Sequence, residues 1–221
     1  MENNYIYLDN ASTTPLSENV LNIINSTYRN YWHNPSSTYE LGIKCSTYLE
    51  KIRSKIACIF EADPEDIIFT SGSSESTNIV FNNIYEKFKN GRVVISNVEH
   101  QATTICANKL RKQNWDIYEW TVNNDGILNI SNIEKFLNND TKLVSIIWGQ
   151  SEIGTIQPVQ FIGSKCEELN IMFHLDGTQI LSNGIFSWKD LKCDFLSLSA
   201  HKFGGPKGIG ILLTKEKSRQ I

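Results

Sequence analysis

Short apolar runs of strand length alternate with helix-length segments along most of the chain. Seven runs read as strands, at 66–70, 92–96, 115–120, 142–148, 170–176, 194–199 and 208–214. Several of them are apolar at consecutive positions, as strands that are buried on both faces tend to be. Helical candidates lie between them at 74–89, 101–113, 131–138 and 159–169. This alternation predicts an α/β fold in which helices sandwich a mostly parallel sheet.

A long amphipathic helix is predicted upstream of the first strand, at 38–60. Apolar residues recur there at helical spacing and predict one buried stripe: Leu41, Cys45, Leu49, Ile52, Ile56 and Phe60. The sequence shows no internal repeat and no low-complexity linker. We therefore expect one structural unit, in which an N-terminal segment with its helix (residues 1–60) packs on a large domain (residues 61–221).

Charge and cysteine content exclude several classes of partner. The chain has 21 Lys and Arg against 24 Asp and Glu, and its net charge of -3 argues against a nucleic-acid or acidic-membrane surface. No run approaches the roughly 18 consecutive apolar residues of a membrane span. The five cysteines are scattered without CxxC spacing, which favours reduced thiols over disulfides or a metal site. We expect a cytoplasmic protein that binds no nucleic acid, membrane or metal.

Polar residues cluster where predicted strands end, which is where ligands bind to sheets of this kind. The stretch 67–78, IIFTSGSSESTN, runs from a strand into a helix. The N–H groups at that helix start, with the hydroxyls of Ser73 and Ser74, suit a phosphate. The alternative is a serine N-cap followed by Glu75 in the first turn. His100 ends the next strand, and a histidine there, taken alone, is more often structural or merely exposed.

Two further strand ends carry ionisable side chains. Asp176 could pair with a cationic ring nitrogen, or it could simply cap the next segment. Lys202 could have a depressed pKa and act as an amine nucleophile, or it could be a solvated lysine in a turn. Taken together, a phosphate cradle, a ring-stacking histidine, a carboxylate and an amine match the needs of pyridoxal 5′-phosphate (PLP).

Seven motifs resemble the NifS/IscS-type cysteine desulfurases, within the class V, fold-type I aminotransferase superfamily. They are YLDNASTTP (7–15), NPSSTYELG (34–42), FTSGSSESTN (69–78), EHQA (99–102), SEIGTIQPV (151–159), FHLDGTQ (173–179) and SAHKFGGPKGIGILL (199–213). Their order and spacing extend over almost the whole chain. The resemblance implies the large, cofactor-binding domain of a PLP-dependent transferase of fold type I.

The resemblance also implies roles for individual residues. Lys202 would bond covalently to PLP and move protons at the substrate α-carbon, Asp176 would keep the pyridine nitrogen protonated, and His100 would stack on the ring. The other implied ligands are Ser73, Ser74, Ser199 and His201 for the phosphate, Gln179 and Ser151 for the phenolic oxygen, and Asn34 for the substrate carboxylate. Ser151 replaces the family's usual asparagine and Gly177 its usual alanine, so we expect weaker tuning of the ring and looser packing beneath it.

The activity implied by the resemblance is that of a PLP-dependent cysteine desulfurase. L-Cysteine would give L-alanine, and the sulfur would pass to a persulfide for iron–sulfur cluster or thio-cofactor assembly. The implied partners are a second copy of the chain, in a homodimer, and a sulfur-acceptor or scaffold protein. Family members continue into a smaller C-terminal domain with the catalytic cysteine. We expect this chain to be the cofactor-binding part alone, with its five cysteines in structural roles.

Three interpretations stay open. The chain is part of a cysteine desulfurase, as a truncated product or one half of a split enzyme. Alternatively, it is a non-catalytic or regulatory paralogue that keeps the fold, or another class V lyase such as a selenocysteine lyase. Ser151 and Gly177 favour the paralogue slightly. Lys202 and Asp176 favour an enzyme more strongly, because a pure scaffold needs no reactive amine.

Overall fold

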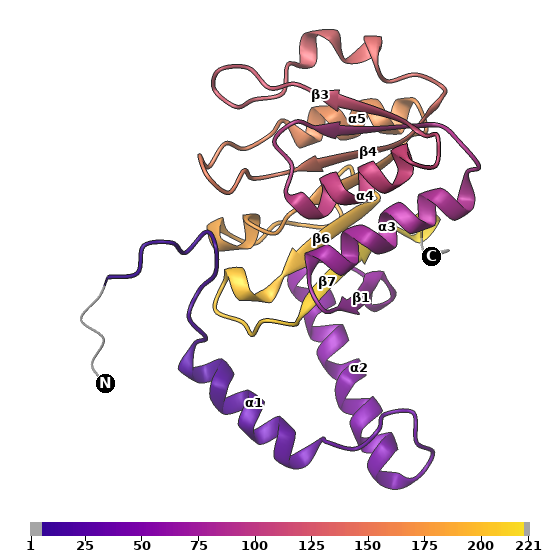
Figure 1. Ribbon diagram of the computed structural model, residues 1–221. Helices are drawn as coiled ribbons and strands as arrows, with labels where there is room; N and C mark the ends of the chain where they lie inside the picture. The colour runs from indigo at the N-terminus through magenta and orange to yellow at the C-terminus, as the bar shows by residue number, and fades with distance from the viewer. Residues whose placement is uncertain (1–5, 219–221) are drawn as a thin grey trace.

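The computed structural model describes residues 6–218 and contains a seven-stranded sheet with the order β1-β7-β6-β5-β4-β2-β3 (Figure 1). The strands are β1 (Ile67–Thr70), β2 (Arg92–Ser96), β3 (Asp116–Trp120), β4 (Thr141–Ile147), β5 (Met172–Asp176), β6 (Phe195–Ser199) and β7 (Gly210–Thr214). Strands β3, β2, β4, β5 and β6 are parallel to their neighbours in that order, whereas β7 is antiparallel to both β6 and β1. The predicted α/β fold with a mostly parallel sheet is confirmed.

Five α-helices accompany the sheet within residues 6–218. They are α1 (Glu18–Asn30), α2 (Glu40–Phe60), α3 (Ser73–Lys87), α4 (Gln101–Arg111) and α5 (Val159–Glu168). The helix expected at 131–138 is instead the 3-10 helix η2 (Ile130–Lys135), because Asn132 has non-helical backbone angles. The sequence reading did not anticipate α1, which begins where the Ser17 hydroxyl accepts a hydrogen bond from the Val20 N–H, at 3.3 Å.

Both faces of the sheet are buried, each under a different pair of helices (Figure 1). On one face α3 and α4 contribute Val80 and Leu110 to a core that includes Val93 of β2. On the other face α2 and α5 contribute Phe60 and Ile162 to a second core. Successive strand residues point to opposite faces, so strands covered on both sides are apolar at consecutive positions.

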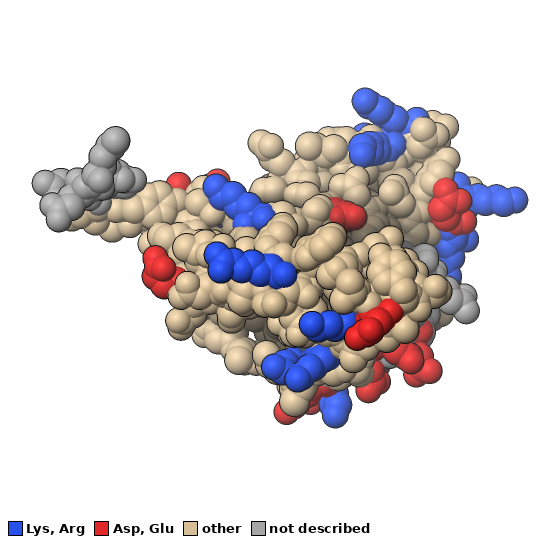
Figure 2. All heavy atoms as spheres, turned by 90° about the horizontal axis from the view of Figure 1, so that it is seen from below, with Lys and Arg blue, Asp and Glu red and all other residues tan. Residues whose placement is uncertain are grey.

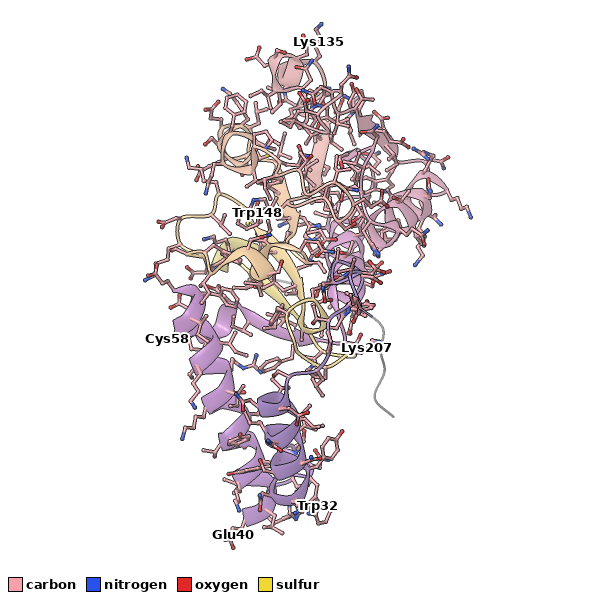
Figure 3. The ribbon with its side chains drawn as sticks, turned by 90° about the vertical axis from the view of Figure 1, so that its left-hand side faces the viewer. Trp32, Glu40, Cys58, Lys135, Trp148 and Lys207 are labelled. Atoms are coloured by element: carbon pink, nitrogen blue, oxygen red, sulfur yellow. The ribbon has the colours of Figure 1, made fainter. Side chains whose placement is uncertain are left out.

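The predicted buried stripe of α2 is only partly correct. Cys45 and Phe60 are buried, but Leu41 and Leu49 are 42% and 37% exposed. The helix packs on the sheet through its C-terminal end, while its N-terminal half projects away from the sheet beside α1 (Figures 1 and 3). Tyr31 at the end of α1 stacks on Tyr48 of this half, but several apolar side chains of the half stay in contact with solvent. The division at residues 1–60 and 61–221, whose ends 1–5 and 219–221 lie outside the described residues, stays a prediction.

A buried polar chain crosses the three central strands of the sheet. His174 of β5 shares one hydrogen bond with the Ser145 hydroxyl and another with the Ser197 hydroxyl, both at 2.8 Å. All three side chains are inaccessible to solvent. Burial lowers the pKa of His174 to about 3, so the imidazole is neutral at physiological pH.

Replacing His174 by glutamine is expected to make the protein less sensitive to acid. As the pH falls below 6.5, His174 binds a proton in the unfolded chain but stays neutral in the folded chain. The free energy of unfolding therefore decreases between pH 6.5 and about 3. His174→Gln removes this loss, which is about 1.4 kcal/mol per pH unit. Urea unfolding of both proteins from neutral to acidic pH measures it. Equal pH slopes for the two proteins would contradict a neutral, buried His174.

Candidate functional site

A cavity of about 630 Å³ opens at the carboxyl ends of the parallel strands. Its lining residues follow β1, β2, β4, β5 and β6, which bring distant parts of the sequence to one edge of the sheet. Nine predicted cofactor residues lie together in this lining: Ser73, Ser74, His100, Ser151, Asp176, Gln179, Ser199, His201 and Lys202. The fold therefore assembles these residues in one place, while their individual roles stay predictions.

The start of α3 forms one wall of the cavity. The Ser73 N–H donates to the Ser199 hydroxyl oxygen at 2.8 Å, and the Ser199 O–H donates to the Ser73 hydroxyl at 3.2 Å. These bonds tie the helix start to the end of β6. The alternative of a serine N-cap is wrong, since Gly72 occupies the cap position without a side-chain bond. Hydroxyls and N–H groups at a helix N-terminus favour an anion.

Lys202 follows β6 in the 3-10 helix η4 (Ala200–Lys202). Its Nζ donates to the backbone carbonyls of Ala11 at 2.6 Å and Ser12 at 2.9 Å. Burial lowers the pKa of Lys202, although the negative charges of Asp176 and Asp9 oppose that shift. A lowered pKa increases the neutral fraction of the amine, which is the form that attacks an aldehyde.

Asp176 ends β5 with its side chain buried at 4% exposure. Its Oδ1 accepts hydrogen bonds from the Thr178 N–H, at 3.0 Å, and from the Thr178 hydroxyl. The carboxylate thus caps the following turn, as one interpretation expected, and also lines the cavity. A carboxylate fixed in this way can hold a proton on a ring nitrogen that enters the cavity.

His100 likewise has both a structural and a cavity-facing position. Its Nδ1 accepts a hydrogen bond from the Ala102 N–H at 3.1 Å and thereby caps the start of α4. The same side chain is among those that line the cavity. The two interpretations of this histidine are therefore compatible.

The N-terminal segment 9–14 closes over the lysine, which the sequence reading did not anticipate. The Gln179 amide donates to the Ala11 carbonyl at 2.7 Å, and His201 Nδ1 shares a 3.1 Å hydrogen bond with the Thr13 hydroxyl. Burial, together with the charges of Lys202 and Lys207, lowers the pKa of His201. Asp9, Ala11, Ser12 and Lys207 line the cavity as well. The only sequence signal for this segment was the motif at 7–15, to which no role had been given.

Asn34 is not among the residues that line the cavity. It lies in the loop between α1 and α2, where its side-chain oxygen accepts a hydrogen bond from the Ser36 N–H at 2.9 Å. Trp32 and Glu40, on either side of this loop, mark the tip of the helical projection in Figure 3. The structure therefore does not bring the predicted substrate residue to the other nine, because this loop lies at the far end of α2.

Four of the five cysteines are buried, as expected for structural thiols. Cys58 on α2 is exposed, unlike a cysteine in the structural role that we expected for all five. Within residues 6–218, no group of three or more His, Cys, Asp or Glu side chains is arranged to hold a metal ion. Over the same range, none of the helices is long and apolar enough to cross a membrane.

The cavity has the donor set that PLP requires. The hydroxyls at the start of α3 can hold a phosphate, the Asp176 carboxylate can hold a protonated ring nitrogen, and the Lys202 amine can meet an aldehyde. An α/β sheet that presents these groups at its carboxyl edge defines the large domain of PLP-dependent transferases of fold type I. Comparison with known proteins gives the family within this class.

The sequence matches the family "Aminotransferase class-V" over residues 6–220, and the chain belongs to this family, whose members depend on PLP. A solved NifS-like protein superposes with a TM-score of 0.92 at 32% identity, over 96% of this chain and 59% of that protein. A structure titled "SspA in complex with cysteine" gives a TM-score of 0.90 at 30% identity, over 96% of this chain and 62% of that chain.

Curated relatives are cysteine desulfurases. The mitochondrial cysteine desulfurase of Eremothecium gossypii is 34% identical over 97% of this chain and 44% of its own length. The cysteine desulfurase IscS of Neisseria meningitidis is 34% identical over 97% of this chain and 54% of its own length. The chain thus spans about half the length of the curated relatives it matches. The resemblance seen in the seven motifs is confirmed.

Proposed function

We propose that this chain is the cofactor-binding part of a cysteine desulfurase that converts L-cysteine to L-alanine. One observation carries the proposal: nine side chains suited to PLP converge from separate strand ends on one cavity with a partly buried lysine amine. The relatives named as cysteine desulfurases support the choice of substrate over that of other class V lyases, including selenocysteine lyases.

The chain's own residues would divide the work within the cavity. PLP, when bound, supplies an aldehyde and an electron-withdrawing ring. Ser73, Ser74, Ser199 and His201 would hold the phosphate end, and Gln179 and Ser151 would bond the phenolic oxygen. Asp176 would keep a proton on the ring nitrogen, and His100 would cover one face of the ring. Lys202 would hold the aldehyde end and then move a proton at the substrate α-carbon.

The complete reaction breaks the Cβ–S bond of cysteine and transfers the sulfur to a cysteine thiol, which becomes a persulfide while the carbon skeleton leaves as alanine. We assign the thiol to a part of the protein other than these 221 residues. Cys45, Cys106, Cys166 and Cys193 are buried, and Cys58 lies on α2 rather than among the residues that line the cavity. Asn34 stays the proposed substrate-carboxylate residue, although its loop lies outside that cavity.

The proposal is tested by incubating the PLP-loaded chain with L-cysteine, alone and together with the polypeptide encoded downstream of Ile221. We expect a cysteine-dependent change in the PLP spectrum for the chain alone, and alanine with sulfide under reducing conditions when both parts are present. A chain that binds PLP but gives no spectral response to cysteine would favour the non-catalytic paralogue, to which Ser151 and Gly177 point.

The proposal also covers partners, role and location. We propose that the chain forms a homodimer, binds a sulfur-acceptor or scaffold protein, takes part in iron–sulfur cluster assembly and is cytoplasmic. Apolar side chains on the helical projection support association with another polypeptide, since Ile23, Trp32 and Ile43 are each more than half exposed. In Figure 2, the charged side chains on this side of the molecule are scattered among uncharged surface. The location is proposed on cysteine usage, and the named relatives include both mitochondrial and bacterial proteins.

A further inference from the structure

Glu99 has a buried carboxyl group next to the cavity that the proposed function does not use. The residue lies after β2, immediately before His100, and its side chain reaches across to β4. Its Oε1 accepts hydrogen bonds from the Ile147 N–H at 2.7 Å and from the Ser96 hydroxyl. These bonds join the segment that carries His100 to the end of β4, where Ile147 itself lines the cavity.

The second oxygen of this carboxyl group is in an unusual position. Oε2 of Glu99 is buried and has no hydrogen-bond partner within residues 6–218. Burying an ionised oxygen without a hydrogen-bond partner raises the free energy of the folded state. A protonated carboxyl group is neutral and avoids the cost of a buried charge. Since Oε1 already accepts two hydrogen bonds, the proton of the neutral carboxyl group belongs on Oε2.

The surrounding charges favour the same protonation state. The pKa of Glu99 is raised to about 8, chiefly by burial. The negative charge of Asp176 on β5 acts in the same direction, while the bonds from Ser96 and Ile147 act in the opposite direction. Asp176 is the ionisable group on the neighbouring strands whose charge acts on Glu99, and His100 is its neighbour in the chain. Two carboxyl groups whose charges act on each other do not both ionise readily.

We propose that Glu99 is a positioning residue of the PLP site: as a neutral acid it fixes the His100 segment to β4 and leaves Asp176 as the only anion of this pair of carboxyl groups. This inference rests on the proposed function. If Glu99 ionises, a second negative charge adjoins Asp176 and acts on a cofactor whose phosphate and phenolic oxygen are already anionic. Cofactor binding should therefore weaken as Glu99 loses its proton.

Three variants separate the charge of Glu99 from its structural bonds. Glu99→Gln keeps an oxygen acceptor for Ser96 and Ile147 but cannot ionise. Glu99→Ala removes the acceptor as well. Glu119→Gln is a matched control, because Glu119 lies on β3 and pairs with Arg111 on the surface. For each protein, the dissociation constant of PLP is measured by fluorescence titration from pH 6 to pH 9.5.

The decisive quantity is the ratio of the wild-type to the Glu99→Gln dissociation constant, because groups that titrate in both proteins cancel. We expect this ratio to be lowest at pH 6 and to rise about fivefold through pH 8. Glu99→Ala should bind weakly at every pH, and Glu119→Gln should follow the wild type. A ratio that is flat with pH would overturn the proposal, since a purely structural Glu99 changes affinity without changing the pH profile.

A measurement on the protein without cofactor distinguishes failure of the proposed function from failure of the proposed role of Glu99. Carbon-13 NMR of glutamate carboxyl groups, assigned by loss of one signal in Glu99→Gln, reports the pKa of Glu99 directly. We expect a titration near pH 8, and a midpoint below pH 6 would overturn the inference. If no variant binds PLP while Glu99 titrates near pH 8, the proposed function fails, and the protonated carboxyl group stands as a property of the fold alone.

Discussion

Lys202→Ala is expected to abolish the borohydride-stable attachment of PLP to the chain. Among the nine predicted cofactor residues lining the cavity, Lys202 is the one with an amine, and its Nζ reaches the backbone of residues 11 and 12 across the cavity mouth. The other lining residue with an amine that could attach to PLP is Lys207, which is exposed on the following turn. We expect at least about a hundredfold less trapped PLP, as measured by intact mass after reduction.

The remaining cavity should still bind PLP non-covalently, because the proposed phosphate and ring contacts come from other residues. The control is Lys135→Ala, at the end of the molecule opposite the helical projection (Figure 3), which should trap PLP as the wild type does. The absorbance of PLP that stays with the protein under non-reducing conditions separates loss of attachment from loss of binding. Equal trapping by Lys202→Ala and the wild type would refute the assignment of the reactive amine.

The sheet could be predicted from the sequence because strands that are buried on both faces are apolar at consecutive positions. Val93, Val94 and Ile95 face alternate cores, so each position of β2 needs an apolar side chain. The parallel order then brings the residues after each strand to one edge. Residues such as Asp176 and Ser199 could therefore be placed together from their positions relative to the strands, without knowledge of any distance.

Other features of the structure depend on contacts between residues that are far apart in the sequence, which a local sequence pattern does not predict. The closure of the N-terminal segment over Lys202 rests on hydrogen bonds between residues about 190 positions apart, such as that from the Lys202 amine to Ala11. The exposure of Leu41 and Leu49 follows from where α2 ends relative to the sheet, which helical spacing does not determine. The position of the Glu99 carboxyl group depends on Ile147 in another strand, and the motif at 99–102 gives no sign of this contact.

A glycine to which the sequence analysis gave no role constrains the anion wall. It is Gly210 in β7, which lies close to the start of α3. A β-carbon there would lie 2.5 Å from the Gly72 Cα and 2.7 Å from the Leu198 carbonyl oxygen.

Gly210→Ala is therefore expected to weaken both the fold and the binding of phosphate. Gly210 pairs with Thr70 of β1 and Ser199 of β6, so an added methyl group meets backbone on both sides and cannot be relieved by rotating a side chain. Overpacking of this kind costs about 1–3 kcal/mol. The displaced Gly72 would separate Ser73 from Ser199 and open the wall that is proposed to hold the phosphate.

The measurement compares PLP with pyridoxal, which lacks the phosphate, in fluorescence titrations, and adds urea unfolding of each protein. Gly210→Ala should lose at least about tenfold more affinity for PLP than for pyridoxal, because the damage is at the phosphate end. Gly177→Ala is the matched control, since its methyl group would meet the ends of the Leu196 and Leu198 side chains, which can move. Equal losses for both ligands would show that Gly210 supports the sheet as a whole and not the anion wall.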